Sequence, residues 1–144
     1  MVDQQKLVAL FNLLEARAKD VYGDPLMTVA EFFDGNDQDY SFAANVEKPP
    51  LSEIQAMLER VETADGVSAV RLVSTHLNER DYCIEVGDWP YTDTVLVVAS
   101  LEEKQVSQLF DVLEPDDIWV GTEERYVGLP PIPSGAQLYN VWWD

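Results

Sequence analysis

The centre of the sequence is the run Thr94-Val95-Leu96-Val97-Val98-Ala99, which lies between Pro90 and Ser100. A short run of β-branched and apolar residues with turn-forming residues at both ends predicts a buried β-strand. Ser100 and Glu103 have the Ser-x-x-Glu spacing of a helix capping box. We therefore expect a helix that begins at Ser100 and ends before Pro115.

The N-terminal part predicts a helix followed by a β-hairpin. Over residues 3–20, apolar side chains recur at intervals of three and four, which is the spacing of an amphipathic helix. Residues 26–33 and 41–46 predict two strands. Between them lies Asp34-Gly35-Asn36-Asp37, which favours a tight turn because glycine and Asx residues tolerate a positive φ.

The segment between this hairpin and the central run predicts one helix and two strands. The helix spans residues 51–61, with Ser52 as its expected cap, and Asp65-Gly66 stops it. Residues 67–77 and 81–86 carry the apolar and β-branched pattern of strands.

The C-terminal part predicts two further short strands, at residues 118–120 and 138–143, on either side of the proline-rich segment 129–135. The predicted order does not alternate regularly between strand and helix. We therefore expect an α+β fold, in which helices pack on one face of a single-layer, mostly antiparallel sheet. The length predicts one domain over residues 1–144.

The composition is that of a globular protein with a large excess of acids. Hydrophobic residues make up 47% and charged residues 25% of the chain, and 27 Asp and Glu against 9 Lys and Arg give a formal net charge of -18. Nucleic acids and anionic membranes are disfavoured partners because the sequence lacks a basic stripe. The acidity has two interpretations, which are solubility alone and an acidic face for a basic protein.

The compartment is predicted from what the sequence lacks. The single cysteine, Cys83, cannot form an internal disulfide, and the N-terminal residues lack the pattern of a signal peptide. No stretch approaches the roughly 18 consecutive apolar residues of a membrane-spanning helix. We therefore expect a cytoplasmic protein without a membrane partner.

The densest acidic cluster consists of Asp34, Asn36, Asp37 and Asp39. An EF-hand loop starting at Asp34 needs glycine at its sixth position and an acid at its twelfth, where this chain has Asp39 and Asn45. The EF-hand interpretation therefore fails, and a non-standard calcium site stays open. The alternative is a turn whose Asx side chains bond their own backbone.

Aromatic residues stand beside acids in the segment Asp88–Asp93, near residues 116–119 and at the C-terminus. Such pairs suit a protein interface that takes up arginine or lysine. The alternative is a core position for Trp89, Trp119 and one of Trp142 and Trp143, because neighbouring strand residues point to opposite faces. The predicted binding residues are Asp34, Asn36, Asp37, Asp39, Trp89, Tyr91, Asp93, Asp116, Asp117 and Trp143.

No pattern of an enzyme emerges from the sequence. His76 is the single histidine, and both it and Cys83 lie in predicted strands without an adjacent partner motif. The sequence contains no glycine-rich phosphate loop. We therefore predict no catalytic residue, no metal ligand and no cofactor.

Several short motifs together carry a resemblance. In chain order they are Phe32-Phe33-Asp34-Gly35-Asn36, Ser41 with Asn45, Trp89-Pro90 with Asp93, Leu113 with Pro115-Asp116, and Trp143-Asp144. The chain resembles a group of small acidic bacterial proteins of unassigned activity, some of which resemble toxin-immunity proteins. The resemblance supplies no catalytic residue and implies that Asp34, Gly35, Asn36 and Asn45 act together in turn geometry.

These observations predict a non-enzymatic module that binds a basic protein, most concretely an immunity-type inhibitor of a basic toxin such as a nuclease. In this hypothesis the acids of the 34–39 loop steer the partner, and Trp89, Tyr91 and Trp143 anchor it. Two alternatives stay open. One is a small metal-dependent hydrolase that uses the 34–39 loop, and the other is a homodimer formed through Trp142 and Trp143.

Overall fold

The predicted central run forms the middle of one six-stranded sheet. The computed structural model describes residues 2–19, 23–75, 77–121 and 125–144. Along the sheet the strand order is β4-β6-β3-β2-β1-β5. Every pairing is antiparallel except that of β1 with β5. The strands are β1 (Asp24–Met27), β2 (Val67–Val73), β3 (Thr94–Ala99), β4 (Asp117–Val120), β5 (Tyr126–Val127) and β6 (Gln137–Trp142).

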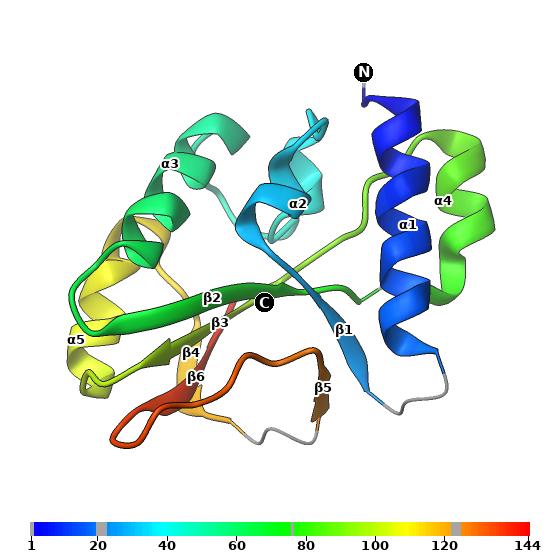
Figure 1. The fold of residues 1–144 in the computed structure, drawn as a ribbon. Coiled ribbons are helices and arrows are strands. Elements are labelled where there is room, and N and C mark those ends of the chain that lie inside the picture. The colour runs from blue at the N-terminus through cyan, green and yellow to red at the C-terminus, as the bar shows by residue number, and fades with distance from the viewer. Residues whose placement is uncertain (1, 20–22, 76, 122–124) are drawn as a thin grey trace.

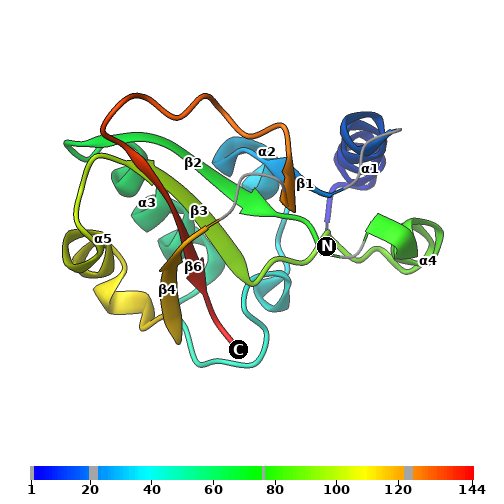
Figure 2. The same ribbon diagram turned by 90° about the horizontal axis from the view of Figure 1, so that it is seen from below.

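Helices cover one face of this sheet (Figures 1 and 2). The helices are α1 (Gln4–Ala18), α2 (Val29–Phe33), α3 (Leu51–Glu62), α4 (Arg80–Val86) and α5 (Glu103–Leu109). Three 3-10 turns complete the secondary structure: η1 (Asp39–Ser41), η2 (Leu77–Glu79) and η3 (Asp111–Leu113). The chain therefore has the predicted α+β fold, with a mostly antiparallel sheet and helices on one face.

The central strand β3 is buried on both faces, which explains its uninterrupted apolar sequence. Val95 and Val97 face the helices in the larger core cluster, whereas Leu96 and Val98 belong to a smaller cluster on the opposite face. Successive side chains of a strand point to opposite faces, so each layer needs its own cover. On the second face, the cover comes from the irregular segment between β5 and β6, through Leu129, Ile132 and Ala136.

The predicted N-terminal hairpin is wrong. Strand β1 ends at Met27, and Thr28 then caps α2. Its Oγ1 accepts a hydrogen bond from the N–H of Glu31 (3.1 Å), while the Glu31 carboxylate accepts one from the N–H of Thr28 (2.8 Å). This reciprocal capping box starts a helix inside the segment 26–33. The expected returning strand is also absent, because residues 39–41 form η1 and Phe42 makes an isolated bridge to Thr92.

The predicted strand at residues 81–86 is wrong as well, because this segment forms α4. Gly87 ends the helix in the left-handed region (φ +80°), and its N–H donates a hydrogen bond to the Cys83 carbonyl over 2.9 Å. Glycine takes this conformation without the penalty that a Cβ imposes. Strand β2 correspondingly ends at Val73, four residues before the predicted end at residue 77.

Two predicted helix caps are wrong, although both helices form. Helix α5 begins after Glu102, whose capping box is with Gln105, and the Ser100 hydroxyl instead donates to the Gly66 carbonyl over 3.4 Å. Helix α3 begins after Pro50, without a hydrogen bond from Ser52 to the helix end.

The other predicted elements agree with the structure. The helix at residues 3–20 is α1, and the short strands at residues 118–120 and 138–143 are β4 and β6. Strand β5 was not predicted, because two residues are too few to show a periodic pattern. Among the described helices, none combines the length and the apolar character that crossing a membrane requires.

Candidate functional site

The loop after α2 is shaped by its own side chains. Asn36 Oδ1 accepts a hydrogen bond from the N–H of Gln38 (3.0 Å), and Asn36 Nδ2 donates to Ser41 Oγ (2.9 Å). This is the Asx turn that the sequence predicted, formed outside a hairpin. Four of the predicted binding residues lie in this loop: Asp34, Asn36, Asp37 and Asp39.

Two exposed carboxylates of this loop have structural partners. The Lys6 ammonium donates to Asp34 Oδ1 over 2.5 Å, and this contact raises the pKa of Lys6. Asp39 Oδ1 accepts a hydrogen bond from the N–H of Leu51 over 3.0 Å, at the first residue of α3. These acids therefore fix the loop against α1 and α3.

The loop also packs against the segment that follows α4, so the structure brings two of the predicted clusters together. Gln38 makes the link, because its Nε2 donates to the Gly87 carbonyl (2.7 Å) and its Oε1 accepts from the Trp89 N–H (2.8 Å). Beside it, the Tyr40 hydroxyl donates to Asp88 Oδ1 (2.7 Å). Burial and the bond to Asp88 raise the pKa of Tyr40 to about 12. The clusters therefore meet through amide and phenol groups.

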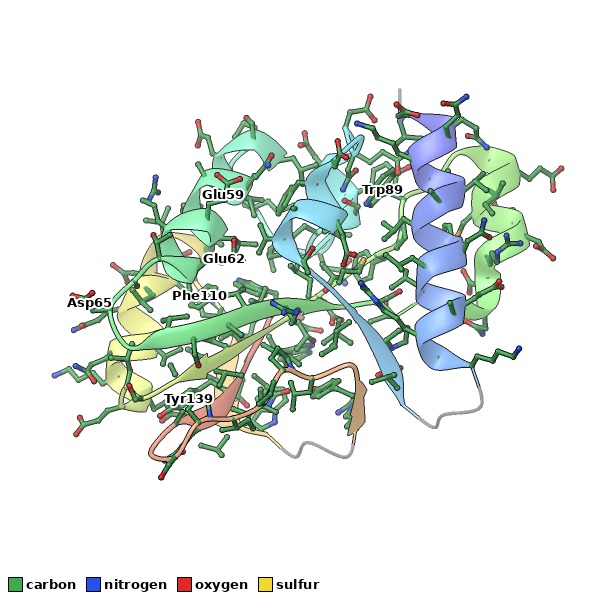
Figure 3. All side chains as sticks on the ribbon, in the orientation of Figure 1. Glu59, Glu62, Asp65, Trp89, Phe110 and Tyr139 are labelled. Carbon is green, nitrogen blue, oxygen red and sulfur yellow. The ribbon has the colours of Figure 1, made fainter. Side chains whose placement is uncertain are left out.

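Two of the three predicted aromatic anchors lie in the core, which corrects the sequence-based hypothesis. Trp89 is 3% exposed and Trp143 is 1% exposed (Figure 3 labels Trp89). The Trp143 ring packs 5.2 Å from Phe42 and 6.1 Å from Phe110, measured between ring centroids. Both indoles are large apolar groups that the helix-side core takes up, so neither is accessible to a partner.

The alternation at the C-terminus explains the position of Trp143. Trp142 is partly exposed, whereas Trp143 is buried, so one of the two enters the core as the sequence predicted. In the predicted homodimer, only Trp142 of these two residues is accessible for a contact between the copies.

The remaining residues of the second predicted cluster are partly buried. Tyr91 lies beside the loop residue Ala44, whose N–H donates to the Tyr91 hydroxyl over 3.3 Å. Asp93 accepts a hydrogen bond from the Thr94 hydroxyl over 2.8 Å. The Asp93 carboxylate therefore supports the start of β3, and the Tyr91 hydroxyl is bonded to the main chain of the neighbouring loop.

The structure brings acids together at another place, a groove of about 550 Å³ between α5 and β4. Figure 2 shows these two elements side by side at the outer end of the sheet. Five of the lining residues are acids and one is a base. We call this surface the acidic groove, and its lining residues are Glu103, Lys104, Ser107, Asp111, Glu114, Pro115, Asp116, Asp117 and Ile118.

The acids of the groove are exposed and uncompensated. Asp116 Oδ2 accepts the N–H of Asp144 (2.6 Å) and Asp117 Oδ1 accepts the N–H of Ile118 (2.9 Å). Across the part of the chain that the structure describes, none of the five groove carboxylates forms an ion pair. The surface therefore presents a concentrated negative charge to solvent.

A buried neighbour responds to this charge. The Tyr139 hydroxyl, which donates to the Leu101 carbonyl over 2.5 Å, has a raised pKa. Burial is the main cause, and the carboxylates of Glu103 and Glu102 add to it. A negative potential disfavours the phenolate, so this direction agrees with an acid-rich start of α5.

A second group of acids on α3 is better balanced. Glu59, Glu62 and Asp65 extend from α3 and from the turn that follows it (Figure 3). The pKa of Glu62 is raised by burial, although the positive charge of Arg71 acts to lower it. The α3 group sets three acids against Arg71, whereas the groove sets five acids against Lys104, so the acidic groove is the more concentrated anionic surface.

A hollow larger than the acidic groove lies elsewhere. It has a volume of about 760 Å³ and is lined by both acids and a base, among them Glu15, Lys19 and Asp24. The buried Ser74 hydroxyl at its wall has no hydrogen-bond partner among the described residues. Charges of both signs are mixed there, so this hollow does not select a partner by charge.

The structure shows no gathered metal ligands in the part of the chain that it describes. In residues 2–19, 23–75, 77–121 and 125–144, no three His, Cys, Asp or Glu side chains form a group that could hold a metal ion. Asp34 and Asp39 of the 34–39 loop bind separate partners, Lys6 and the N–H of Leu51. Cys83 is buried, and burial, followed by the charges of Asp88 and Glu79, raises the pKa of its thiol. His76 lies outside the described residues.

A comparison with protein-family models matches nearly the whole chain to one family. The model of the YfbO family, described as a family of uncharacterised proteins, matches residues 3–141. The chain belongs to the YfbO family. This agrees with the resemblance to proteins of unassigned activity, and it adds no link to toxin immunity. The searches of curated proteins and of solved structures found no match.

The YfbO family match covers the groove, and part of the groove could have been found in the sequence. Asp116 and Asp117 were predicted, whereas Glu103, Asp111 and Glu114 were missed. Together with Ser107, these three recur at intervals of four, four and three residues, which places them on one face of a helix. That spacing was a usable signal, but the sequence does not show that the face borders the edge strand.

Proposed function

We propose that this protein is a non-enzymatic module that binds a basic protein, with the acidic groove as its docking surface. The observation that carries the proposal is the groove lining, in which five carboxylates stand against the single ammonium of Lys104. A cleft lined by one sign of charge focuses the electrostatic field and raises the association rate of an oppositely charged partner.

The corrected positions of the tryptophans change how the partner is held. Since Trp89 and Trp143 are buried, the apolar contact must come from side chains that are accessible at the groove. Val112 on η3 and Val120 on β4 are 70% and 55% exposed, respectively. Val112 follows the groove residue Asp111 in the chain, and Val120 is two residues after the groove residue Ile118 on β4, so exposed apolar area is available next to the charge, as at the edge of a protein interface.

In its finer form, the proposal is that the module acts as an immunity-type inhibitor of a basic toxin such as a nuclease. A nuclease needs a cationic surface for phosphates, and the groove offers carboxylates that match such a surface. This form is tested by expressing the product of a neighbouring open reading frame with and without this chain. Relief of toxicity by the wild-type chain supports it, and unchanged toxicity contradicts it.

The docking surface is tested with two triple variants of equal charge change. The groove variant carries Glu103→Gln, Asp111→Asn and Glu114→Gln. The control variant carries Glu47→Gln, Glu79→Gln and Glu85→Gln, whose side chains are exposed and lie away from the groove. Each immobilised protein is incubated with native cell extract at low salt, and the captured proteins are identified by mass spectrometry.

The expected result is a basic protein that the wild type and the control variant capture and that the groove variant loses. Equal capture by both variants contradicts the groove as the docking surface. Failure of all three proteins to capture any basic protein contradicts the proposed function itself.

A further inference from the structure

The acidic groove lies beside the free edge of the sheet. Strand β4 is the terminal strand in the order β4-β6-β3-β2-β1-β5, and within the described part of the chain its one partner strand is β6. A terminal strand presents main-chain donors and acceptors that another extended segment can use. The opposite terminal strand, β5, has only two residues, so β4 is the longer edge.

The register shows which main-chain groups of β4 face outward. Trp119 is opposite Asn140, and the N–H of Gly121 donates to the Leu138 carbonyl over 2.8 Å, so alternate residues of β4 bond to β6. Ile118 and Val120 therefore direct their main-chain groups away from β6. The N–H of Ile118 is bonded to the side chain of Asp117, which agrees with this direction.

The same two residues have side chains on the groove side of the sheet. Ile118 is opposite Val141, and Val120 is opposite Tyr139. Val141 and Tyr139 belong to the helix-side core, and residues directly opposite one another in a sheet share a face. A segment paired with β4 would place every second side chain on this face, below α5 and next to the groove acids.

We propose that the basic partner enters as an extended segment that adds a strand to β4, with lysine or arginine at alternate positions. This inference rests on the proposed function, and it names how the partner is recognised. Charge complementarity selects the occupant, because the alternate side chains meet Glu103, Asp111 and Glu114. Main-chain bonds to Ile118 and Val120 provide affinity that depends little on sequence, as in other strand additions.

Strand addition also gives Asp117 a second role. In the free protein its carboxylate covers the N–H of Ile118, which blunts the edge against indiscriminate pairing. When a partner carbonyl takes over this N–H, the Asp117 carboxylate becomes available to a cation. Binding therefore exchanges one local hydrogen bond for a main-chain bond and an ion pair.

The first experiment compares two synthetic peptides of identical composition. In one, lysine alternates with threonine, and in the other the lysines are grouped at one end. Strand addition predicts that the alternating peptide binds the wild-type protein about tenfold more tightly, because strand pairing then places all of its lysines on the groove face, and two additional ion pairs give about a factor of ten. Equal affinity for the two peptides overturns the inference.

The second experiment removes one outward N–H. Val120→Pro deletes the donor that faces away from β6, a position where an edge strand tolerates proline. Val120→Thr is the matched control, because it retains the N–H and the β-branched shape. We expect Val120→Pro to weaken binding of the alternating peptide about fivefold, which is the effect of one net hydrogen bond, whereas Val120→Thr leaves it unchanged. Equal affinity of both folded variants overturns the inference.

A third measurement does not depend on the folding of a variant. In the wild-type protein, bound alternating peptide should slow amide hydrogen exchange at Ile118 and Val120, because the N–H of Val120 becomes bonded and that of Ile118 exchanges its exposed side-chain acceptor for a main-chain carbonyl. Unchanged exchange at both amides with saturating peptide overturns strand addition. If the wild type binds both peptides equally and the groove variant binds neither, strand addition is wrong and the groove remains the proposed docking surface. If the groove variant binds both peptides like the wild type, the docking surface fails instead.

Discussion

The indole N–H of Trp143 donates a hydrogen bond to the main-chain oxygen of Leu113 over 2.7 Å. This bond ties the end of the chain to η3, the turn that carries the groove residue Asp111. Trp143 therefore contributes to the acidic groove from the inside, by fixing one of its walls. A residue expected to contact a partner instead positions a residue of the proposed docking surface.

Replacement of Trp143 should cost stability in two steps. Trp143→Phe retains the ring packing but leaves the Leu113 carbonyl without its donor, which should cost about 1–3 kcal/mol. Trp143→Ala also removes the ring from between Phe42 and Phe110 and should cost about 3–5 kcal/mol. Urea denaturation followed by circular dichroism measures both free energies of unfolding. Unchanged stability of Trp143→Ala with weakened partner binding would instead favour the surface anchor.

The contribution of the Thr28 cap of α2 to stability can be measured against a control substitution at Ser52, an exposed hydroxyl residue that does not cap α3. Thr28→Ala removes the acceptor for the Glu31 N–H and should cost about 1 kcal/mol. Ser52→Ala should change the free energy of unfolding by less than about 0.5 kcal/mol, because Ser52 is exposed and does not cap α3. Thermal and urea denaturation of both variants provide the measurement. Equal losses would restore the sequence-based cap at Ser52.

The particular errors show what a single sequence reveals about this fold. Strand β3 was predictable because a strand buried on both faces is apolar throughout. The pair Thr28 and Glu31 had the spacing of a capping box, but the aromatic residues that follow also suit a strand, and packing against the sheet decides between them. The segment of α4 is similarly ambiguous, because a helix of seven residues is too short to show a clear period.

The candidate site was less predictable than the fold, for a physical reason. Acids that cluster in the sequence suggest a binding site, but in the structure Asp34 is paired with Lys6 and Asp39 is bonded to the first residue of α3. The uncompensated acids are separated in the chain and are brought together only by the packing of α5 against β4. Long-range placement of this kind cannot be derived from local spacing.

The pH dependence of stability should include a contribution from Glu31. Burial acts to raise its pKa, but the bonds and charge from Arg17 and the bonds from Thr28 outweigh it, so the pKa lies below 4.5. A lowered pKa stabilises the fold above the ordinary pKa, and this stabilisation is lost as the pH falls through the folded value. The free energy of unfolding of the wild type should therefore fall more steeply below pH 4.5 than that of Glu31→Gln. Parallel curves between neutral pH and this acidic range would contradict the assignment.

The last prediction concerns the rate at which the partner is captured. If the acidic groove steers the partner, the association rate constant should fall steeply as the ionic strength rises, because salt screens charges beyond about 10 Å at 0.1 M. The association rate constant of the groove variant should depend less steeply on ionic strength. The control variant, which has the same net charge as the groove variant, should show the dependence of the wild type. Stopped-flow mixing with the alternating lysine peptide at a series of salt concentrations measures these slopes. The comparison separates two causes, since the two variants have the same net charge, whereas three of the five groove carboxylates are absent from only one of them. Equal slopes for the two variants would mean that overall acidity, and not the groove, governs the encounter.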